Sequence, residues 1–367
     1  MVQQARYEVR LYDPASGLLM AIFDAWDKLH YEKIFNDVAP YTFELPSTDP
    51  RVALFKLDAI FEVWRTPDGG DRYLEYTGFH RSPEFTIKNS RQTFLSTGES
   101  LLSLISRKCI MYPSVSAYTL KSGPGESVIK SYVDENAGPG ASAALRVVSG
   151  VTPGLTIAPD AAQGDFWFGD RAFIRLLDVI KEVSLTTRID FDVVRTGPLT
   201  FEFRTYFPQL GIDRRANIIF APNLGNMDNP SYSIERKGET TIAVALGQGT
   251  GVSRQRVAVT SAAATDSQWN RIEAVQEAGS EDTYSGLLAA ANKMIVDNGA
   301  KESFTFDIMP AATLYGRDFF HGDIVTARFN DITRATKIIG VSVDVAAGTE
   351  KIGFTFGQLA TPGIPVP

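Results

Sequence analysis

Cysteine is almost absent from this sequence, since Cys109 is the only one among 367 residues. A single cysteine excludes a framework of internal disulfide bonds. Cys109 lies in an apolar stretch with Leu104, Ile105 and Ile110 that is predicted to be helical. We therefore expect a buried, inert thiol.

Long apolar runs and an excess of positive charge are also missing. No run approaches the roughly 18 apolar residues that cross a membrane, and residues 1–6 lack the apolar core of a signal peptide. The net charge is -7, whereas a protein that binds duplex DNA needs a concentrated basic surface. Small clusters such as Arg214-Arg215 and Arg254-Gln255-Arg256 are typical of solvated surface. We expect a protein made in the host cytoplasm, without cofactor and without stable membrane insertion.

Motifs for nucleotide binding and for nucleophilic catalysis are missing as well. The chain has no Gly-Lys-Ser/Thr phosphate loop and no Gly-x-Ser-x-Gly elbow. The glycine-rich segment 247–251 follows a predicted strand, but residues 252–259 are β-like, whereas a dinucleotide site needs a helix there. We interpret the segment as a turn between antiparallel strands.

The polar residues that could carry chemistry have simpler interpretations. Asp318, His321 and Asp323 lie within six residues and resemble a metal site, but only His30 and His80 supply further imidazoles. Turn chemistry explains the aspartates and Gly322 equally well, and whether this group binds an ion stays open.

Two carboxylate pairs keep one class of enzyme in view. Asp190 and Asp192 share a predicted strand face, and Glu273 and Glu277 are one turn apart on a predicted helix. Two carboxylates suffice for a glycosidase, but such pairs are common on exposed faces. We therefore predict no catalytic, cofactor-binding or metal-binding residues, and no enzyme.

What the sequence does contain is strand pattern and aromatic residues, including 23 phenylalanines. Alternating apolar positions such as Val341, Val343 and Val345, together with Ile339, predict antiparallel sheet with one buried face near the C-terminus. Most aromatics are expected in the core. Phe79 and the Phe319-Phe320 pair are either core or interface anchors.

Strands dominate both ends of the chain and helices lie between them. Residues 1–95 are predicted to form a first β-barrel domain, with strands at 7–11, 41–45, 61–64 and 73–79. Residues 96–210 are predicted to form an α+β domain. Its helices are expected at 99–108, at 126–136 and after a cap at Asp170, and its strands at 189–193 and 199–205.

A second β-barrel domain is predicted to be split in sequence. It comprises residues 211–260 and 302–360, with strands at 231–237, 240–246 and 255–260. A helical insertion, residues 261–301, is expected to pack with the α+β domain, and its helices are predicted at 266–279 and 282–298. Residues 361–367 form a C-terminal tail. The fold class is therefore α+β and β-rich, with two antiparallel barrel-like β domains.

Several segments, in this order, match a known family. They are Tyr-Glu-Val-Arg-Leu-Tyr-Asp at 7–13, Leu-His-Tyr-Glu-Lys-Ile-Phe-Asn at 29–36, Phe-Glu-Leu-Pro at 43–46, Glu-Tyr-Thr-Gly-Phe at 75–79, Thr-Gly-Glu-Ser-Leu-Leu at 97–102, Val-Ala-Leu-Gly-Gln-Gly at 244–249, Tyr-Gly-Arg-Asp-Phe at 315–319 and Gly-Asp-Ile-Val at 322–325. With this set the chain resembles the tail hub (tail-tip, baseplate hub) proteins of long-tailed bacteriophages, in the family typical of siphophages that infect actinobacteria.

The resemblance implies a homotrimer in the virion, at the tip of the phage tail. Three copies would place six barrels in a pseudo-sixfold ring that adapts a sixfold tail to a threefold tip. The implied partners are the distal tail protein ring, the tape measure protein and other tail-tip or fibre proteins. DNA would pass the lumen only transiently when the trimer opens, which the acidic balance suits. Many such hubs continue into wall-degrading or receptor-binding domains, and after residue 357 only a short tail follows, so a bare hub is expected.

Two other functions stay open from the sequence. One is a tail-associated hydrolase of the cell wall that uses a carboxylate pair. The other is a receptor- or carbohydrate-binding tail module, which would need aromatic platforms on exposed loops.

Overall fold

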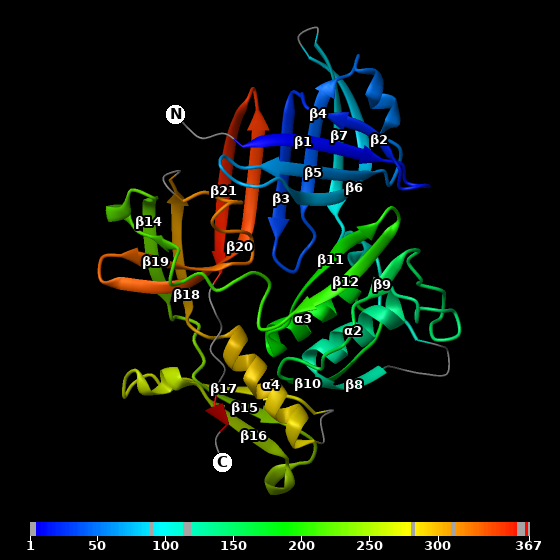
Figure 1. Ribbon diagram of the computed structural model, residues 1–367. Helices are drawn as coiled ribbons and strands as arrows, with labels where there is room; N and C mark the ends of the chain where they lie inside the picture. Colours follow the sequence, from blue (N-terminus) through cyan, green and yellow to red (C-terminus); the bar gives the residue numbers. More distant parts are fainter. Residues whose placement is uncertain are drawn as a thin grey trace.

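The computed structural model describes residues 5–88, 91–112, 119–279, 283–309, 313–357 and 364–365. Strands form most of the regular structure, and helices α2, α3 and α4 lie in the lower half of the view in Figure 1. This confirms the α+β, β-rich class. None of the described helices is long and apolar enough to cross a membrane.

The first seven strands form one continuous ladder, in the order β2-β1-β5-β6-β7-β4-β3. Their bounds are β1 Arg6–Tyr12, β2 Leu19–Phe23, β3 Lys28–Ile34, β4 Pro40–Pro46, β5 Ile60–Thr66, β6 Tyr73–Lys88 and β7 Arg91–Ser100. The expected hairpin of β5 and β6 is confirmed, with Ile60 opposite Phe79. Gly98 of β7 permits close packing, because a Cβ there would lie 1.9 Å from the Phe79 carbonyl oxygen.

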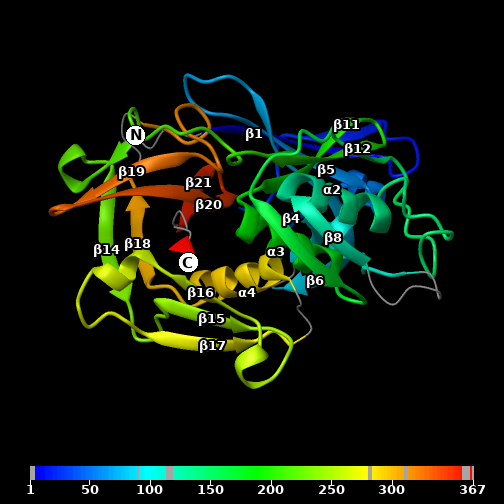
Figure 2. The same cartoon turned by 90° about the horizontal axis from the view of Figure 1, so that it is seen from below.

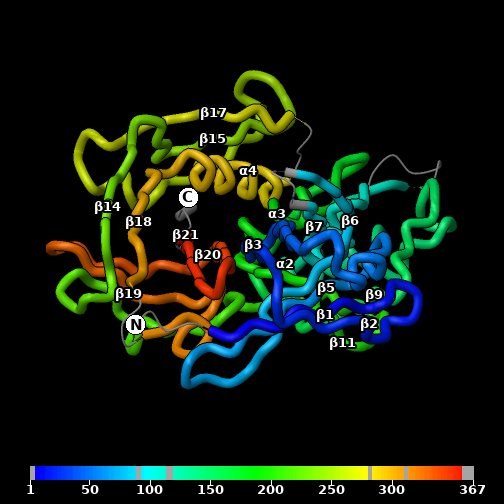
Figure 3. Tube along the Cα trace, turned by 90° about the horizontal axis from the view of Figure 1, so that it is seen from above, coloured from blue at the N-terminus to red at the C-terminus, as the bar shows by residue number. Residues whose placement is uncertain are grey.

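The C-terminal strands extend this ladder instead of standing apart from it. They are β13 Ile219–Phe220, β19 Ile324–Phe329, β20 Ile332–Ala346 and β21 Thr349–Gly357. β20 pairs antiparallel with β3, with Val343 opposite Tyr31, so a single sheet of eleven strands spans both ends of the chain. Figure 3 shows β20 and β21 beside β3.

The expected alternation along β20 is confirmed at Val341, Val343 and Val345, which are buried. It is wrong at Ile339, which is only partly buried. The register shifts between Ile338 and Gly340, so a bulge takes Ile339 out of phase and Ile338 is the buried residue.

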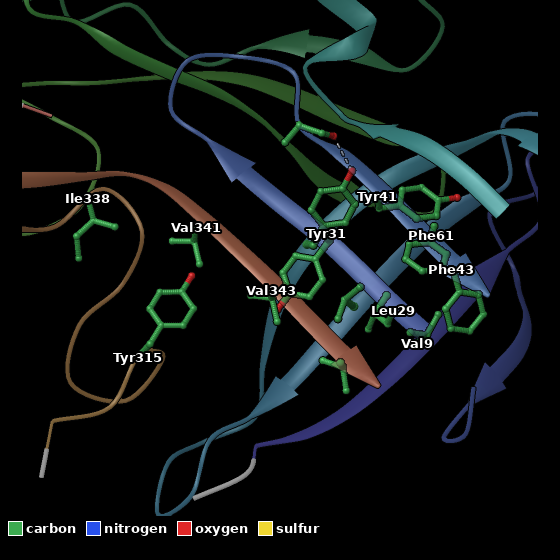
Figure 4. Packing of buried hydrophobic residues seen from close by; sticks show 14 of the residues in the cluster. Val9, Leu29, Tyr31, Tyr41, Phe43, Phe61, Tyr315, Ile338, Val341 and Val343 are labelled. Carbon is green, nitrogen blue, oxygen red and sulfur yellow. Dashed lines mark hydrogen bonds between the residues drawn. The ribbon is translucent and has the colours of Figure 1, made fainter. Parts of the chain in front are cut away.

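One hydrophobic core joins the two groups of strands. Figure 4 shows Tyr31, Tyr41 and Phe61 from the first strands packed near Val341 and Val343 of β20. Tyr41 stacks on Phe61 with ring centroids 4.0 Å apart. Because residues about 300 positions apart in sequence share this core, the two ends of the chain stabilise each other.

A second core belongs to the α+β region in the middle of the chain. Its elements are α1 Ser103–Ser106, β8 Thr119–Pro124, α2 Gly125–Asn136, β9 Leu155–Ile157, β10 Phe166–Arg171, α3 Leu176–Thr187, β11 Asp190–Gly197 and β12 Thr200–Tyr206. Leu176, Ile180 and Val183 of α3 are fully buried, as the helical spacing predicts. α3 contacts α2 and β10, and Phe191 and Val193 of β11 belong to the same core.

A third, smaller core lies between α4 Tyr284–Asp297 and a sheet of β17 Glu273–Glu277, β15 Ile242–Leu246, β16 Arg256–Thr260 and β22 Ile364–Pro365. Figure 2 shows α4 over one face of this sheet. α4 also contacts β10, so this unit lies against the α+β region. β14 Met227–Glu235 pairs with β18 Lys301–Ile308 and contributes to the first core.

The sheet order changes the expected second β domain. β15 and β16 pair with β17 and β22 and pack on α4, whereas residues 211–260 are expected to form one barrel with residues 302–360. The large sheet runs from β13 to β2, and within the described residues no pairing joins these two end strands. Closed barrels and the remaining domain limits stay predictions.

Three expected helices differ from the structure. Residues 273–277 form strand β17, because parallel pairing with β15 satisfies their backbone and overrides the local helical pattern. Glu99 and Ser100 continue β7, which leaves only α1 as helix in 99–108. Asp170 lies in β10 opposite Leu120, and α3 begins after Arg175. The helix expected at 126–136 is confirmed as α2 and that at 282–298 as α4, although residue 282 lies outside the described residues.

Candidate functional site: a buried charge cluster and a cavity at the junction

A cluster of buried charges ties the first strands to the last. Arg65 of β5 donates from Nη2 to Glu350 Oε1 of β21 at 2.7 Å and from Nη1 to the Tyr315 carbonyl at 2.6 Å. The Tyr315 hydroxyl donates to Glu75 Oε1 of β6 at 2.7 Å. Tyr7 of β1 also donates to Glu350. Arg65 and Glu350 are 4% and 7% exposed, so this is an interior ion pair that holds separate segments together.

The turn that enters this cluster requires a glycine. Gly316 has φ +80, and a Cβ on it would lie 2.3 Å from the Tyr73 hydroxyl and 2.4 Å from Arg65 Nη1. The Tyr-Gly-Arg-Asp-Phe segment of the sequence analysis therefore has a structural reason. It positions Tyr315 and Phe319 in the core and leaves room for the arginine.

Asp318, His321 and Asp323 each have other hydrogen-bond partners in the structure. Asp318 binds Arg317 and the Leu314 amide, while Asp323 is buried and accepts from the Ile212 amide at 2.6 Å. Asp323 also accepts from Arg214 at 2.6 Å. No group of three potential metal ligands occurs among the described residues.

His321 points elsewhere, with Nε2 3.3 Å from the Ile339 carbonyl. Burial lowers its pKa to about 3. The neutral imidazole therefore belongs to the folded protein at physiological pH.

A cavity of about 220 Å³ lies where the large sheet, the α+β region and the turn at His321 meet. Lys33 and Glu75 line it from the sheet, and Asp192 lines it from β11. Lys33 Nζ lies 3.6 Å from Glu75 Oε1, while the buried Oε2 of Glu75 has no hydrogen-bond partner among the described residues. Burial raises the pKa of Asp192 to about 6, against the Val193 amide and the Lys33 charge, which lower it. Sequence reasoning missed this grouping, because its members are far apart in the chain.

The carboxylates of the two expected pairs have different partners in the structure. Asp190 is buried and bonds Lys337 and the Leu210 amide, whereas Asp192 faces the cavity. Burial raises the pKa of Asp190 and lowers that of Lys337, so the pair forms at a desolvation cost. Glu273 and Glu277 lie on strand β17, and Glu277 pairs with Arg254 on the surface.

The remaining residues of interest have structural positions. The glycine-rich segment joins antiparallel β15 and β16, with Gly249 and Gly251 at positive φ, which confirms the turn interpretation. Phe79 and Phe319 are core residues, while Phe320 is half-buried against Tyr73. Cys109 is only partly buried and follows α1 instead of lying within a helix, so that prediction is wrong.

Solved structures share this fold along its whole length. A tail protein from Neisseria meningitidis MC58 aligns with a TM-score of 0.57 and 11% identity, covering 99% of this chain and 97% of that one. The prophage MuSo2 43 kDa tail protein from Shewanella oneidensis aligns with a TM-score of 0.60 and 11% identity, covering 96% and 98%. Prophage tail protein gp18 from Listeria monocytogenes EGD-e gives 0.55 and 9%, covering 98% and 93%. The fold is therefore that of phage tail proteins.

The family model of Siphovirus ReqiPepy6 Gp37-like proteins matches residues 8–358. The chain belongs to this family, and the expected kinship with siphophage tail proteins is confirmed. Curated proteins give no match to the sequence.

Proposed function

We propose that the protein is a structural hub of the phage tail tip. In this role it closes the distal tail tube as a homotrimer, adapts sixfold to threefold symmetry and opens for DNA. Family membership and the tail-protein fold support a structural protein of the virion tail or baseplate. Its proposed partners are two further copies, the distal tail protein ring, the tape measure protein and fibre proteins.

The observation that carries the proposal is the pairing of β3 with β20. It joins the first strands and the last strands into one sheet with one core. A subunit that contributes two β modules to a ring has to hold them at a fixed relative angle. A shared sheet and the buried Arg65–Glu350 pair provide that rigidity.

Light scattering on the purified chain tests the trimer. A mass near three times 40.2 kDa is the expected result. A monomer or dimer at about 100 µM, both alone and mixed with the distal tail protein, contradicts it. Image averages of the assembled particle along its axis should show threefold symmetry.

The cavity supports a second candidate, a hydrolase of the cell wall. Glu75 and Asp192 both line it, and a carboxyl with a pKa of about 6 suits a general acid. Zymography on cell wall decides between the two functions. Clearing by the wild-type chain that the Asp192→Asn variant loses would establish the enzyme, and no clearing by either leaves the hub.

A further inference from the structure

Glu75 of β6 brings a carboxylate oxygen without a partner to the cavity between the large sheet and the α+β region. The residue is 3% exposed, and its Oε1 accepts from the Tyr315 hydroxyl at 2.7 Å. Its Oε2 is also buried and accepts no hydrogen bond from the described residues. A buried carboxylate oxygen without a donor is costly, so this position favours a ligand that donates hydrogen bonds.

Asp192 presents a second carboxylate to the same cavity from strand β11. The Val193 amide donates to its Oδ1 at 2.7 Å, and within the described part of the chain no other group donates to this side chain. Burial raises the pKa of Asp192 to about 6. Above that pH the carboxylate is ionised in surroundings that disfavour its charge, so a nearby cation would stabilise it.

The cations at the cavity do not balance these carboxylates. Lys33 Nζ lies 3.6 Å from Glu75 Oε1, and its charge also lowers the pKa of Asp192. Arg195 lines the cavity too, but it is paired with Glu62 at 2.8 Å. A single lysine between two ionised carboxylates leaves one buried negative charge without a counter-charge.

Apolar side chains form much of the remaining wall, and part of this wall reaches the surface. Tyr76 and Phe191 are buried, whereas Ile34 and Leu74 are 36% and 37% exposed. The volume of about 220 Å³ is several times that of a water molecule, so a short alkyl chain fits inside. Aromatic rings in the wall also attract a cation. A positively charged group on an apolar stem therefore matches both the charge and the lining.

We propose that this cavity binds a protonated primary amine on a short alkyl chain. The ammonium group lies between Glu75 and Asp192 and donates to Oε2 of Glu75, and the alkyl chain extends along the apolar wall towards Leu74. A lysine side chain of another protein and a free alkylamine share this chemistry. The inference depends neither on the hub role nor on catalysis in the cavity.

Two other ligand classes fit the cavity less well. An anion would meet the two carboxylates, and the nearby Lys33 already pairs with one of them. A metal ion would need more ligands, because the described ranges contain no group of three potential metal-binding side chains.

Calorimetry on the full chain tests the proposal with n-butylammonium and with n-butanol as its neutral counterpart. Butylammonium should bind at least ten times more tightly than butanol. Asp192→Asn should weaken this binding at least tenfold, while Glu277→Gln, which changes an exposed carboxylate outside the cavity, should leave it unchanged. Equal affinity for the two compounds, or an equal loss in the two variants, overturns the proposal.

A peptide separates the two sources of the amine. Acetyl-Gly-Gly-Lys-Gly-Gly-amide is compared with the same peptide carrying Gln in place of Lys. Tighter binding of the Lys peptide than of butylammonium assigns the cavity to a lysine of a partner protein, and the reverse assigns it to a free alkylamine. If neither amine binds, the proposal is wrong. Mg²⁺ and N-acetylglucosamine probe the other ligand classes, and a higher Asp192-dependent affinity for either of them than for both amines overturns the assignment.

Lys33 supplies a second measurement. Lys33→Gln removes the cation that competes for Glu75, so butylammonium should bind at least threefold more tightly, whereas Lys237→Gln changes an exposed cation elsewhere and should have no effect. Butylammonium should also raise the thermal midpoint of the wild-type chain, because a ligand of the folded state stabilises it. Unchanged or weaker binding by Lys33→Gln, or an equal rise of the midpoint in Asp192→Asn, contradicts the proposal.

Discussion

At the scale of single residues, the lack of a side chain at Gly316 leaves room for the Tyr73 hydroxyl and the Arg65 guanidinium in the core. Gly316→Ala should destabilise the protein by about 2–3 kcal/mol, because the methyl group both strains positive φ and meets the Tyr73 hydroxyl and Arg65. Gly348→Ala is the matched control. Gly348 also has positive φ, but nothing lies within 4 Å of its Cβ position, so about 1 kcal/mol is expected. Urea unfolding measures both, and equal losses would refute the steric part of the argument.

Asp192 gives a pH dependence of defined sign. Its pKa is about 6 in the folded protein and about 3.9 in the unfolded chain, so the folded state binds more protons between these values. Stability from this group is therefore highest below pH 4, falls as pH rises to about 6 and stays low above it. Asp192→Asn should be about 1–3 kcal/mol more stable than the wild-type chain at pH 7 and equal to it near pH 4. Unfolding curves at both pH values check this, and a variant less stable at pH 7 would contradict it.

At the scale of elements, helix α4 packs on one face of the sheet of β15, β16 and β17. Leu287 of α4 is 1% exposed and packs with β15 and β16. Leu287→Ala should cost about 2–4 kcal/mol through the cavity it leaves. Val252→Ala, at a fully exposed position, should change stability by less than about 0.5 kcal/mol.

Hydrogen exchange locates the effect of Leu287→Ala. Faster exchange should appear in β15, β16 and α4, while β4 and β5 keep their protection, because they belong to a different core. Uniform acceleration over the whole chain would show that the α4 unit and the large sheet unfold together.

Elements with strong local patterns could be predicted from the sequence, and those set by distant partners could not. Apolar residues alternate along β1, β4 and β11 and follow helical spacing along α2 and α3. These patterns depend only on neighbouring positions in the chain, so they were sufficient to predict the elements. β17 was missed because its strand state depends on β15, some thirty residues earlier. A helix-start signal also gave a wrong prediction, because Asp170 has the residue type of a helix N-cap but lies in strand β10.

The candidate sites show the same division. The Gly-rich turn could be recognised locally, whereas the pairing of Asp323 with Arg214, about 110 residues earlier, could not. The cavity at Asp192 could not be found from the sequence, because Glu75 and Asp192 carry no common motif. Only folding brings them together.

At the scale of the whole molecule, the Arg65–Glu350 pair joins the two ends of the chain. Glu350→Gln should destabilise the protein by about 3 kcal/mol, because it leaves a buried guanidinium without a counter-charge. Glu277→Gln removes a carboxylate that is 69% exposed from an ion pair with Arg254, and should cost less than about 1 kcal/mol. Denaturant unfolding of both variants tests this. Similar losses in the free energy of unfolding would mean that the buried ion pair stabilises the protein no more than the exposed one.

The pairing of β3 with β20 also has a consequence for synthesis. The edge of β3 leaves the ribosome roughly 300 residues before its partner strand, which is about 15–60 s at ordinary elongation rates. Throughout that time a strand with unpaired backbone groups is available to the edges of other nascent chains. Pairing of β3 with the edge of another nascent chain during this interval would compete with its pairing to β20 of the same subunit.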